Sequence, residues 1–287
     1  DFLNATLYTY ETYGSSKCRE WIELALNRAV TISNLNILNT YFPTCTTIES
    51  KLDLERVILY IKGALSTMAM VDYPYNLNFV APLPANPVNF SCNSVEPDIH
   101  DDVELIKALR HVVSIFVNFT GNLDCFDTDK EMLSSSNFLK NPLGDITRPW
   151  NYQACSELIL EPLSAEGLGF VVPNENQIHS IEAACKKLFG SDFVSRPDFA
   201  LKKYGNGIEM SQNLHNVLFV DGDKDPWRVG SVPRNASSYS HDGSVRHILA
   251  VDSAHHQDLR YSSPSDSKSL WNVKLTEQRE VLKWLKE

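Results

Sequence analysis

The chain has 287 residues, of which 43% are hydrophobic and 22% are charged, and its formal net charge at pH 7 is −10. These proportions are typical of a protein with a packed core, and the length suits one large domain or two smaller ones. The negative charge argues against a nucleic-acid partner, because binding phosphates requires clustered Lys and Arg.

The first ~130 residues have the pattern of a mostly helical region. Apolar residues recur at three- and four-residue steps in Cys18–Ser33, Leu52–Met70 and Val103–Phe119, so each of these segments predicts a helix. The apolar stretch Val57–Met70 is interrupted by a lysine and a glycine and falls short of the ~18 residues that a membrane span requires. We therefore expect a buried helix there and no membrane span.

A proline-rich segment, Asp72–Cys92, lies between the second and third predicted helices. Its prolines stand at positions 74, 82, 84 and 87. Because proline removes a backbone donor and restricts the preceding residue, this spacing predicts an extended, ordered segment without a helix. The following Leu133–Ser211 is interrupted by Ser, Pro and Gly, and within it Glu175–Phe189 is a candidate helix.

The last 75 residues follow a different pattern. Asn216–Val220 and Arg246–Val251 are short, continuous apolar runs, as in buried parallel strands, and Val273–Lys286 is an amphipathic helix. The apolar side of that helix carries Leu275, Leu282 and Leu285. Strands alternating with loops and a helix indicate an α/β fold. Two strands cannot form a parallel sheet that is covered on both faces, so further strands are expected.

The cysteines and glycosylation sequons favour the secretory pathway. The six cysteines include no C-x-x-C pair, which argues against zinc-ribbon and thioredoxin-like sites. Their even number permits three disulfides, although six unpaired thiols in a cytosolic protein remain an alternative. The four N-x-[ST] sequons, candidates for glycosylation, begin at Asn4, Asn89, Asn118 and Asn235. With no initial Met and no signal peptide, the chain is expected to be a processed or truncated product.

Polar residues follow both predicted strands. The aspartate loop (residues 221–227) reads DGDKDPW, and the histidine loop (residues 252–260) reads DSAHHQDLR. Functional groups gather at the carboxyl ends of parallel strands, and an acid followed by a histidine is the Asp…His half of a hydrolase triad. In such a triad the carboxylate fixes the imidazole tautomer and stabilises the imidazolium.

Three other interpretations of these loops were weighed. The aspartate loop matches the start of a calcium loop, but Pro226 and Val232 stand where Gly and Glu are needed. The paired histidines with Asp258 resemble a metal site, but tandem side chains on a strand point in opposite directions. We therefore expect no metal and no other cofactor. Spacing alone leaves open a structural role, in which an aspartate caps the loop and a histidine is buried.

Longer motifs resemble one family. GDKDPW, with AHHQDLR some thirty residues later, is similar to the Asp and His motifs of the prolyl carboxypeptidase and dipeptidyl peptidase II family. MVDYPYNLNFVAPLPANPV (Met70–Val88) resembles the family's proline-rich cap segment, and WNYQAC (Trp150–Cys155) resembles its substrate-site motif. PLPANPV is closer to the dipeptidyl peptidase II wording.

The resemblance implies a fold and a disulfide pattern. The fold class is α/β: the C-terminal part of an α/β-hydrolase domain, residues 131–287, plus an inserted, mostly helical, disulfide-bonded cap domain, residues 1–130, which is N-terminally incomplete. The implied disulfides are Cys18–Cys92, Cys45–Cys125 and Cys155–Cys185.

The resemblance also implies roles for residues of the site. Asp225 is the triad acid and His255 the general base, with His256 and Arg260 as supporting neighbours. By the same resemblance, Trp227 is a wall of the S1 pocket and Leu160 adds apolar surface to it. An indole face suits a proline ring, which offers only apolar contact.

Asn151 departs from both branches of the family, because dipeptidyl peptidase II carries Asp at this position and prolyl carboxypeptidase carries Ser. The Asp anchors the amino terminus of the substrate. A neutral amide makes a weaker hydrogen bond to an ammonium group than a carboxylate does, so relaxed selection is expected.

The implied function is a serine-type exopeptidase that releases dipeptides from peptide N-termini after Pro or Ala-like residues, in the lysosome, in another acidic vesicle or after secretion. The alternatives are a Pro-Xaa carboxypeptidase and a non-catalytic, secreted peptide-binding protein. No G-x-S-x-G occurs in the 287 residues, so the serine nucleophile is missing and this polypeptide alone is expected to be inactive. The expected partners are peptides with Pro or a small residue at the cleaved position, and a homodimer remains open.

Overall fold

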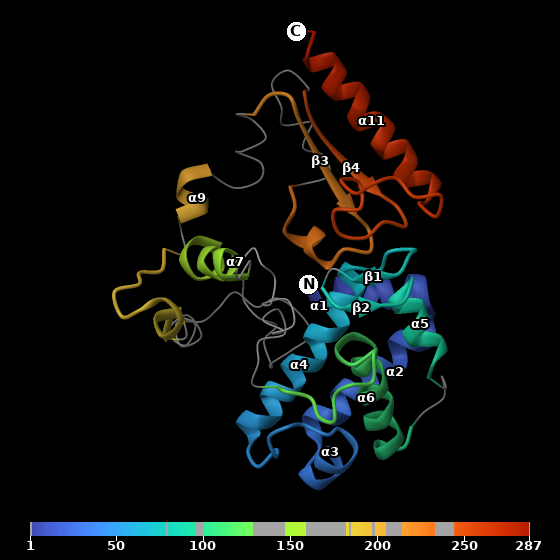
Figure 1. Cartoon of the computed structure of the whole chain (residues 1–287), viewed down its shortest axis with the longest axis vertical. Helices are drawn as coiled ribbons and strands as arrows, with labels where there is room; N and C mark the ends of the chain where they lie inside the picture. Colours follow the sequence, from blue (N-terminus) through green and yellow to red (C-terminus); the bar gives the residue numbers. More distant parts are fainter. Residues whose placement is uncertain are drawn as a thin grey trace.

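The structure is a computed structural model, and it describes residues 2–78, 80–95, 100–128, 147–158, 182–183, 185–196, 199–204, 214–232 and 244–286. Helices packed on one another form the lower part of Figure 1, and a pair of strands with the C-terminal helix lies above them. The expected domain boundary, between residues 130 and 131, lies outside the described residues.

The helices of the first part of the chain share one apolar core, to which β1 (Leu77–Asn78), β2 (Pro82–Leu83) and α5 (Pro87–Asn93) also contribute. Most of this core comes from α1 (Phe2–Thr9), the π-helical turn η1 (Tyr10–Gly14), α2 (Ser16–Thr31), α3 (Leu35–Tyr41), α4 (Lys51–Met70) and α6 (Asp102–Val117). The three predicted helices are confirmed as α2, α4 and α6, with ends that differ by at most two residues. Among the described residues, no helix combines the length and apolar character needed to cross a bilayer.

Helix α4 shows why the ends of these helices could be predicted closely from the sequence. The Ser50 side chain accepts a hydrogen bond from the Asp53 backbone N–H, and the Asp53 carboxylate accepts one from the Ser50 N–H, which completes a capping box. The middle of the helix is buried, including Ile61 and Leu65, which have no exposed surface. Its C-terminal residue, Met70, lies beside the candidate site described below.

The proline-rich segment is only partly extended. Strands β1 (Leu77–Asn78) and β2 (Pro82–Leu83) pair antiparallel, as an extended segment allows. The prediction that Asp72–Cys92 contains no helix is wrong, because α5 spans Pro87–Asn93. Pro87 is the first residue of this helix, where the missing N–H would have no intrahelical partner in any case.

Three disulfides connect distant segments of the chain. The structure joins Cys18 to Cys92, Cys45 to Cys125 and Cys155 to Cys185, and these are the pairs that the family resemblance implies. The first disulfide ties α2 to α5, and the second ties the segment after α3 to the segment after α6.

Further short helices lie between the two regions in sequence. They are α7 (Thr147–Gln153), the π-helical turn η3 (Ala154–Leu158) and α9 (Phe199–Tyr204). Residues 182–183 and 185–189 are also helical, in the second half of the candidate helix Glu175–Phe189.

The two predicted strands are confirmed as β3 (Val217–Gly222) and β4 (Val245–Ala250), which pair in parallel with Val217 opposite Val245. Helix α11 (Lys268–Trp284) begins five residues earlier than predicted and packs on the sheet through Leu270 and Val273. The leucines of its predicted apolar side do not face this sheet. They are exposed: Leu275, Leu282 and Leu285.

Candidate active site

The parallel pairing of β3 and β4 brings the aspartate loop and the histidine loop together at one end of the sheet, facing the helical region (Figure 1). Gly222 makes their close approach possible. A Cβ atom at this position would lie 2.4 Å from the Ser253 carbonyl oxygen and 2.7 Å from the Ala254 carbonyl oxygen, both of which are backbone atoms. Only glycine fits between the two loops here.

Asp225 and His255 are hydrogen-bonded across the two strand ends. The distance between Oδ2 of Asp225 and Nδ1 of His255 is 2.6 Å, and their side chains are 9% and 28% exposed. The other carboxylate oxygen, Oδ1, accepts a hydrogen bond from the Trp227 backbone N–H at 3.0 Å and so caps the short 3-10 helix η4 (Pro226–Gly230). Both oxygens of the carboxylate are therefore held, which fixes the imidazole with its Nε2 away from the aspartate.

The backbone of His255 is held from the helical region. The His255 N–H donates to the Met70 carbonyl at 2.9 Å, and the Tyr73 hydroxyl donates to the His255 carbonyl at 2.6 Å. Burial raises the pKa of Tyr73 to about 12, so this hydroxyl remains a donor at any physiological pH. The C-terminal end of α4 and the residues after it therefore set the position of the imidazole.

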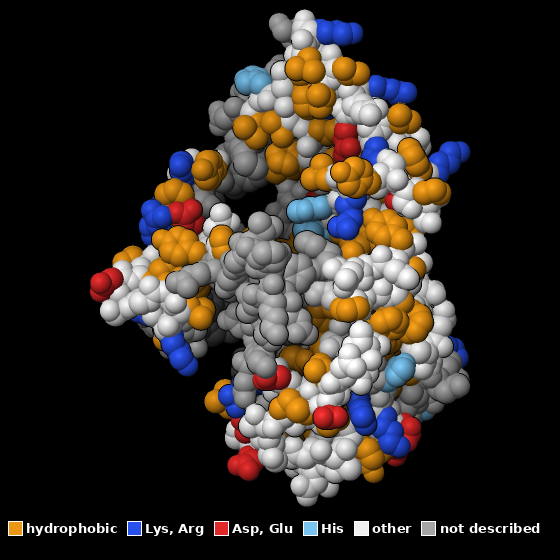
Figure 2. Space-filling model, in the orientation of Figure 1, with side chains coloured by type: hydrophobic (Ala, Val, Ile, Leu, Met, Phe, Trp, Pro, Cys, Tyr) orange, Lys and Arg blue, Asp and Glu red, His pale blue; other side chains and the backbone are white. Residues whose placement is uncertain are grey.

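The two neighbours implied by the family resemblance lie at the same place. The ring of His256 stacks on that of His255 with centroids 3.7 Å apart, and burial, together with the neighbouring His255, lowers the pKa of His256. The Arg260 guanidinium lies 4.6 Å from the centre of the Tyr73 ring. Figure 2 shows histidine and basic side chains at the surface between the strand region and the helical region.

Trp227 forms an apolar wall beside the pair and is held on several sides. Its Nε1–H donates to the sulfur of Met70 at 3.2 Å, and its ring makes edge contacts with Phe2 at 5.1 Å and with Trp150 at 6.5 Å between centroids. Phe2 and Met70 could not be assigned to the site from the sequence, because an apolar residue on a helix has the same pattern when it belongs to the core.

Other predicted residues are placed only in part or lie elsewhere. Leu160 and Asn235 fall outside the described residues, and of Asn151 the structure describes the helical backbone in α7 but not the side chain. Asn4 and Asn89 are exposed, whereas Asn118 is half-buried and its amide exchanges two hydrogen bonds with the Leu123 backbone. In the described part of the chain, no group of three His, Cys, Asp or Glu residues is arranged to hold a metal ion.

A buried Asp hydrogen-bonded to a His, each following one of two adjacent parallel strands, is characteristic of hydrolases that use a catalytic triad. Comparison with known families agrees with this class. The family described as serine carboxypeptidase S28 matches residues 1–277, and the chain belongs to that family.

Individual proteins that the chain matches are similar to it at low sequence identity. Over 265 residues the chain is 27% identical to the lysosomal Pro-X carboxypeptidase of Bos taurus. This alignment covers 92% of the chain and 49% of the relative. The prolyl carboxy peptidase like protein 5 of Caenorhabditis elegans is 28% identical over 269 residues, which are 88% of this chain and 49% of the relative. The human thymus-specific serine protease is 28% identical over 148 residues, which are 48% of this chain and 26% of the relative. The chain thus spans about half the length of the Pro-X carboxypeptidases it matches.

Proposed function

We propose that Asp225 supplies the acid, and His255 the general base, of a serine-type exopeptidase. The observation that carries the proposal is the 2.6 Å contact between Nδ1 of His255 and Oδ2 of Asp225. With Nδ1 donating to the carboxylate, Nε2 is the ring nitrogen that accepts the proton of an attacking serine. The imidazolium so formed is stabilised by the Asp225 charge and then protonates the leaving amine.

The nucleophile belongs, in this proposal, to sequence outside the 287 residues. A nucleophile elbow needs a strand, G-x-S-x-G and a helix, and no G-x-S-x-G occurs in this chain. We place the elbow on additional strands that extend the β3–β4 pair into an α/β-hydrolase sheet formed with residues 131–287, with residues 1–130 as the cap. Two features support this: among the described residues β3 pairs only with β4, which is a small sheet for such a domain, and the outer side of α11 is apolar and exposed.

The substrate in this proposal is a peptide with proline or a small residue at the cleaved bond. The face of Trp227 provides apolar contact without a hydrogen-bonding demand, which suits a pyrrolidine ring. Binding a proline ring to this fixed indole orders few bonds, because the ring is rigid, whereas a long flexible side chain would lose more conformational entropy. A cap over one end of the cleft restricts cleavage to chain ends, and the lysosome or another acidic vesicle is the proposed compartment.

The proposal leaves two candidate activities, which cleave peptides from opposite ends. Dipeptide release from the N-terminus is the first candidate, because the Met70–Val88 segment resembles dipeptidyl peptidase II more than prolyl carboxypeptidase. Removal of a single residue after proline at the C-terminus is the second, and the names of the Pro-X carboxypeptidase relatives favour it.

The test uses the full-length protein with two substrates, an Ala-Pro chromogenic amide with a free amino terminus and an N-blocked Pro-Phe dipeptide with a free carboxyl terminus. Hydrolysis of the amide alone supports dipeptidyl peptidase activity, and hydrolysis of the blocked dipeptide alone supports carboxypeptidase activity. Hydrolysis of neither by a folded full-length protein contradicts the enzymatic proposal and favours a peptide-binding role. The 287-residue polypeptide, purified separately, is expected to hydrolyse neither substrate.

A further inference from the structure

Lys224 lies between Asp223 and Asp225 in the aspartate loop, and its side chain is only 4% exposed. Its ammonium nitrogen is 3.0 Å from Oδ2 of Asp72 and 2.8 Å from Oδ1 of Asp252, and it also donates to the Asp72 carbonyl at 3.3 Å. A buried lysine is costly unless it is paired, so a specific arrangement must hold it.

The partners of Lys224 belong to the segments that position the imidazole. Asp72 lies between Met70 and Tyr73, whose carbonyl and hydroxyl bond the two backbone polar groups of His255. Asp252 is the first residue of the histidine loop. The ammonium therefore joins the loop that carries the acid, the loop that carries the base and the chain segment that holds the base.

Tyr13 adds a fourth segment to this arrangement. The Lys224 ammonium lies 4.4 Å from the centre of the Tyr13 ring. The Tyr13 hydroxyl donates to Oδ2 of Asp223 at 2.5 Å and accepts from the Asp252 backbone N–H at 3.0 Å, so it also bridges the two loops. Burial raises the pKa of Tyr13 far above its usual value, and Asp223 acts in the same direction, which keeps the hydroxyl a donor.

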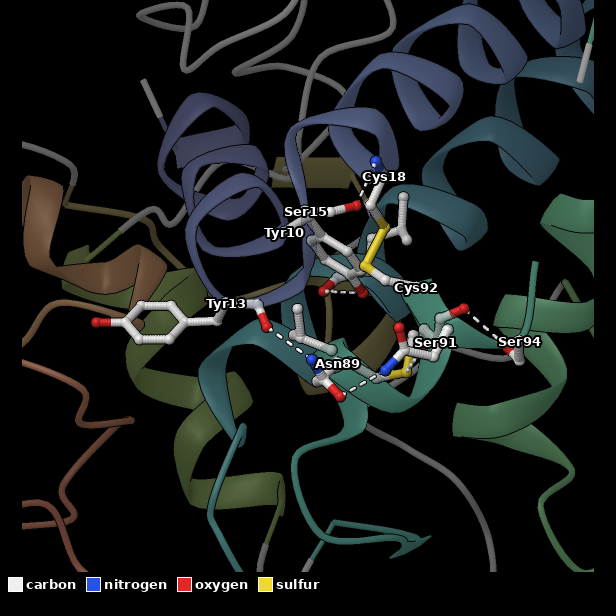
Figure 3. Close-up of a disulfide and its surroundings, with 12 residues drawn as sticks. Tyr10, Tyr13, Ser15, Cys18, Asn89, Ser91, Cys92 and Ser94 are labelled. Atoms are coloured by element: carbon white, nitrogen blue, oxygen red, sulfur yellow. Dashed lines mark hydrogen bonds between the residues drawn. A yellow bond between two sulfur atoms is a disulfide. The ribbon is translucent and has the colours of Figure 1, made fainter. Parts of the chain in front are cut away.

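The position of Tyr13 is fixed by the disulfide region. Figure 3 shows Tyr13 at the end of η1, its ring directed away from the Cys18–Cys92 disulfide and its carbonyl oxygen bonded by the Asn89 side chain. Gly14, the next residue, passes so close to this disulfide that a Cβ atom there would lie 2.2 Å from the Cys92 sulfur. The segment that presents Tyr13 is thus held by a covalent cross-link.

The charges in this cluster keep the ammonium in place. Burial alone would lower the pKa of Lys224, but Asp72 and Asp252 outweigh burial and raise the pKa. Burial raises the pKa of the Asp72 carboxyl, and the Lys224 charge opposes that rise. Removing the lysine alone would therefore leave Asp72 as a buried carboxyl without its counter-charge, a strongly destabilising situation.

We infer that Lys224 is a positioning residue for the Asp225–His255 pair, acting by holding the aspartate loop, the histidine loop and the Met70–Tyr73 segment at fixed separations. The inference rests on the proposed function, because it assigns to Lys224 the alignment of that acid and base. A displacement of about 1 Å in an aligned catalytic group lowers turnover by as much as ~100-fold. Alignment affects the chemical step, so kcat falls while KM changes little.

The experiment compares three variants of the full-length protein: Lys224→Met, the double variant Lys224→Met/Asp72→Asn, and Lys51→Met as a surface control at a lysine that is 87% exposed. The single variant is expected to unfold at lower temperature. The double variant removes both buried charges, so it is expected to recover stability. It is nevertheless expected to keep a kcat about 10- to 100-fold below wild type with KM within about twofold, while the control matches wild type.

A double variant with wild-type kcat overturns the inference, because Lys224 would then serve only as a counter-charge. If the wild-type protein hydrolyses neither substrate, the proposed function fails, and a crystal structure of the double variant still decides the positioning role. Separation of the Asp225 and His255 side chains beyond hydrogen-bond distance supports that role, and an unchanged contact refutes it.

Discussion

Replacing Asp225 with Asn separates the two roles of this carboxylate. Oδ1 caps η4 through the Trp227 N–H, and Oδ2 accepts from Nδ1 of His255. In Asp225→Asn the amide oxygen can keep the cap, which places the amide NH2 against Nδ1. Nδ1 must then act as an acceptor, so the imidazole proton moves to Nε2 and this nitrogen can no longer take a proton from serine.

The expected cost is a fall in kcat of about 10⁴-fold, the size found when a triad aspartate is replaced by asparagine in a serine protease. That factor corresponds to about 5 kcal/mol of lost transition-state stabilisation. Asp225→Ala should match this kinetic loss and in addition lose the cap, at a cost of ~1 kcal/mol in folding stability.

The assay is steady-state hydrolysis by the full-length protein, with thermal unfolding of each variant measured in parallel. An Asp225→Asn protein that folds normally and keeps more than about a tenth of the wild-type kcat would show that Asp225 does not set the tautomer of a catalytic His255, since the wrong tautomer causes a larger loss.

Two further predictions concern stability. Burial and the Asp258 carboxylate raise the pKa of Glu277 to about 7. A raised pKa favours the protonated folded state, so this contribution is complete below the unfolded value of 4.5 and is lost as pH rises through 7. Glu277→Gln should therefore unfold at a higher temperature than wild type at pH 8 but not at pH 4.5, and an equal difference at both would contradict this. Gly14→Ala should prevent the Cys18–Cys92 disulfide from closing, at a cost of about 2–5 kcal/mol in folding stability. Mass spectrometry of free thiols and thermal unfolding would detect this loss. The control Gly230→Ala, with no atom within 4 Å of the added Cβ, should retain the disulfide.

The local patterns predicted the elements that carry the candidate pair. The apolar runs before the aspartate and histidine loops became β3 and β4, because a short apolar stretch that ends in polar residues matches few other structures. The chemistry of Asp225 and His255 could then be placed at one end of a sheet from strand order alone. Helix α5 differs from the sequence-based expectation because proline, which breaks the interior of a helix, is favourable at its first position.

The contacts that hold the pair in place could not be predicted in the same way. Lys224 and Asp72 are 152 residues apart, and Tyr13 and Asp223 are 210 apart. A lysine between two aspartates has the pattern of a solvated loop, and its burial depends on how the helical region meets the sheet. No periodicity within one segment encodes that packing.

The proposed catalytic function requires Asp225 and His255 to act as acid and general base toward a serine. The most direct measurement is a crystal structure of the full-length protein after reaction with an organophosphonate that labels serine nucleophiles. We expect the labelled Oγ within hydrogen-bond reach of Nε2 of His255, with Nδ1 still bonded to Asp225. A labelled serine that is paired with a different base, or a His255 turned away from it, would rule out this pair as the acid and base of the enzyme.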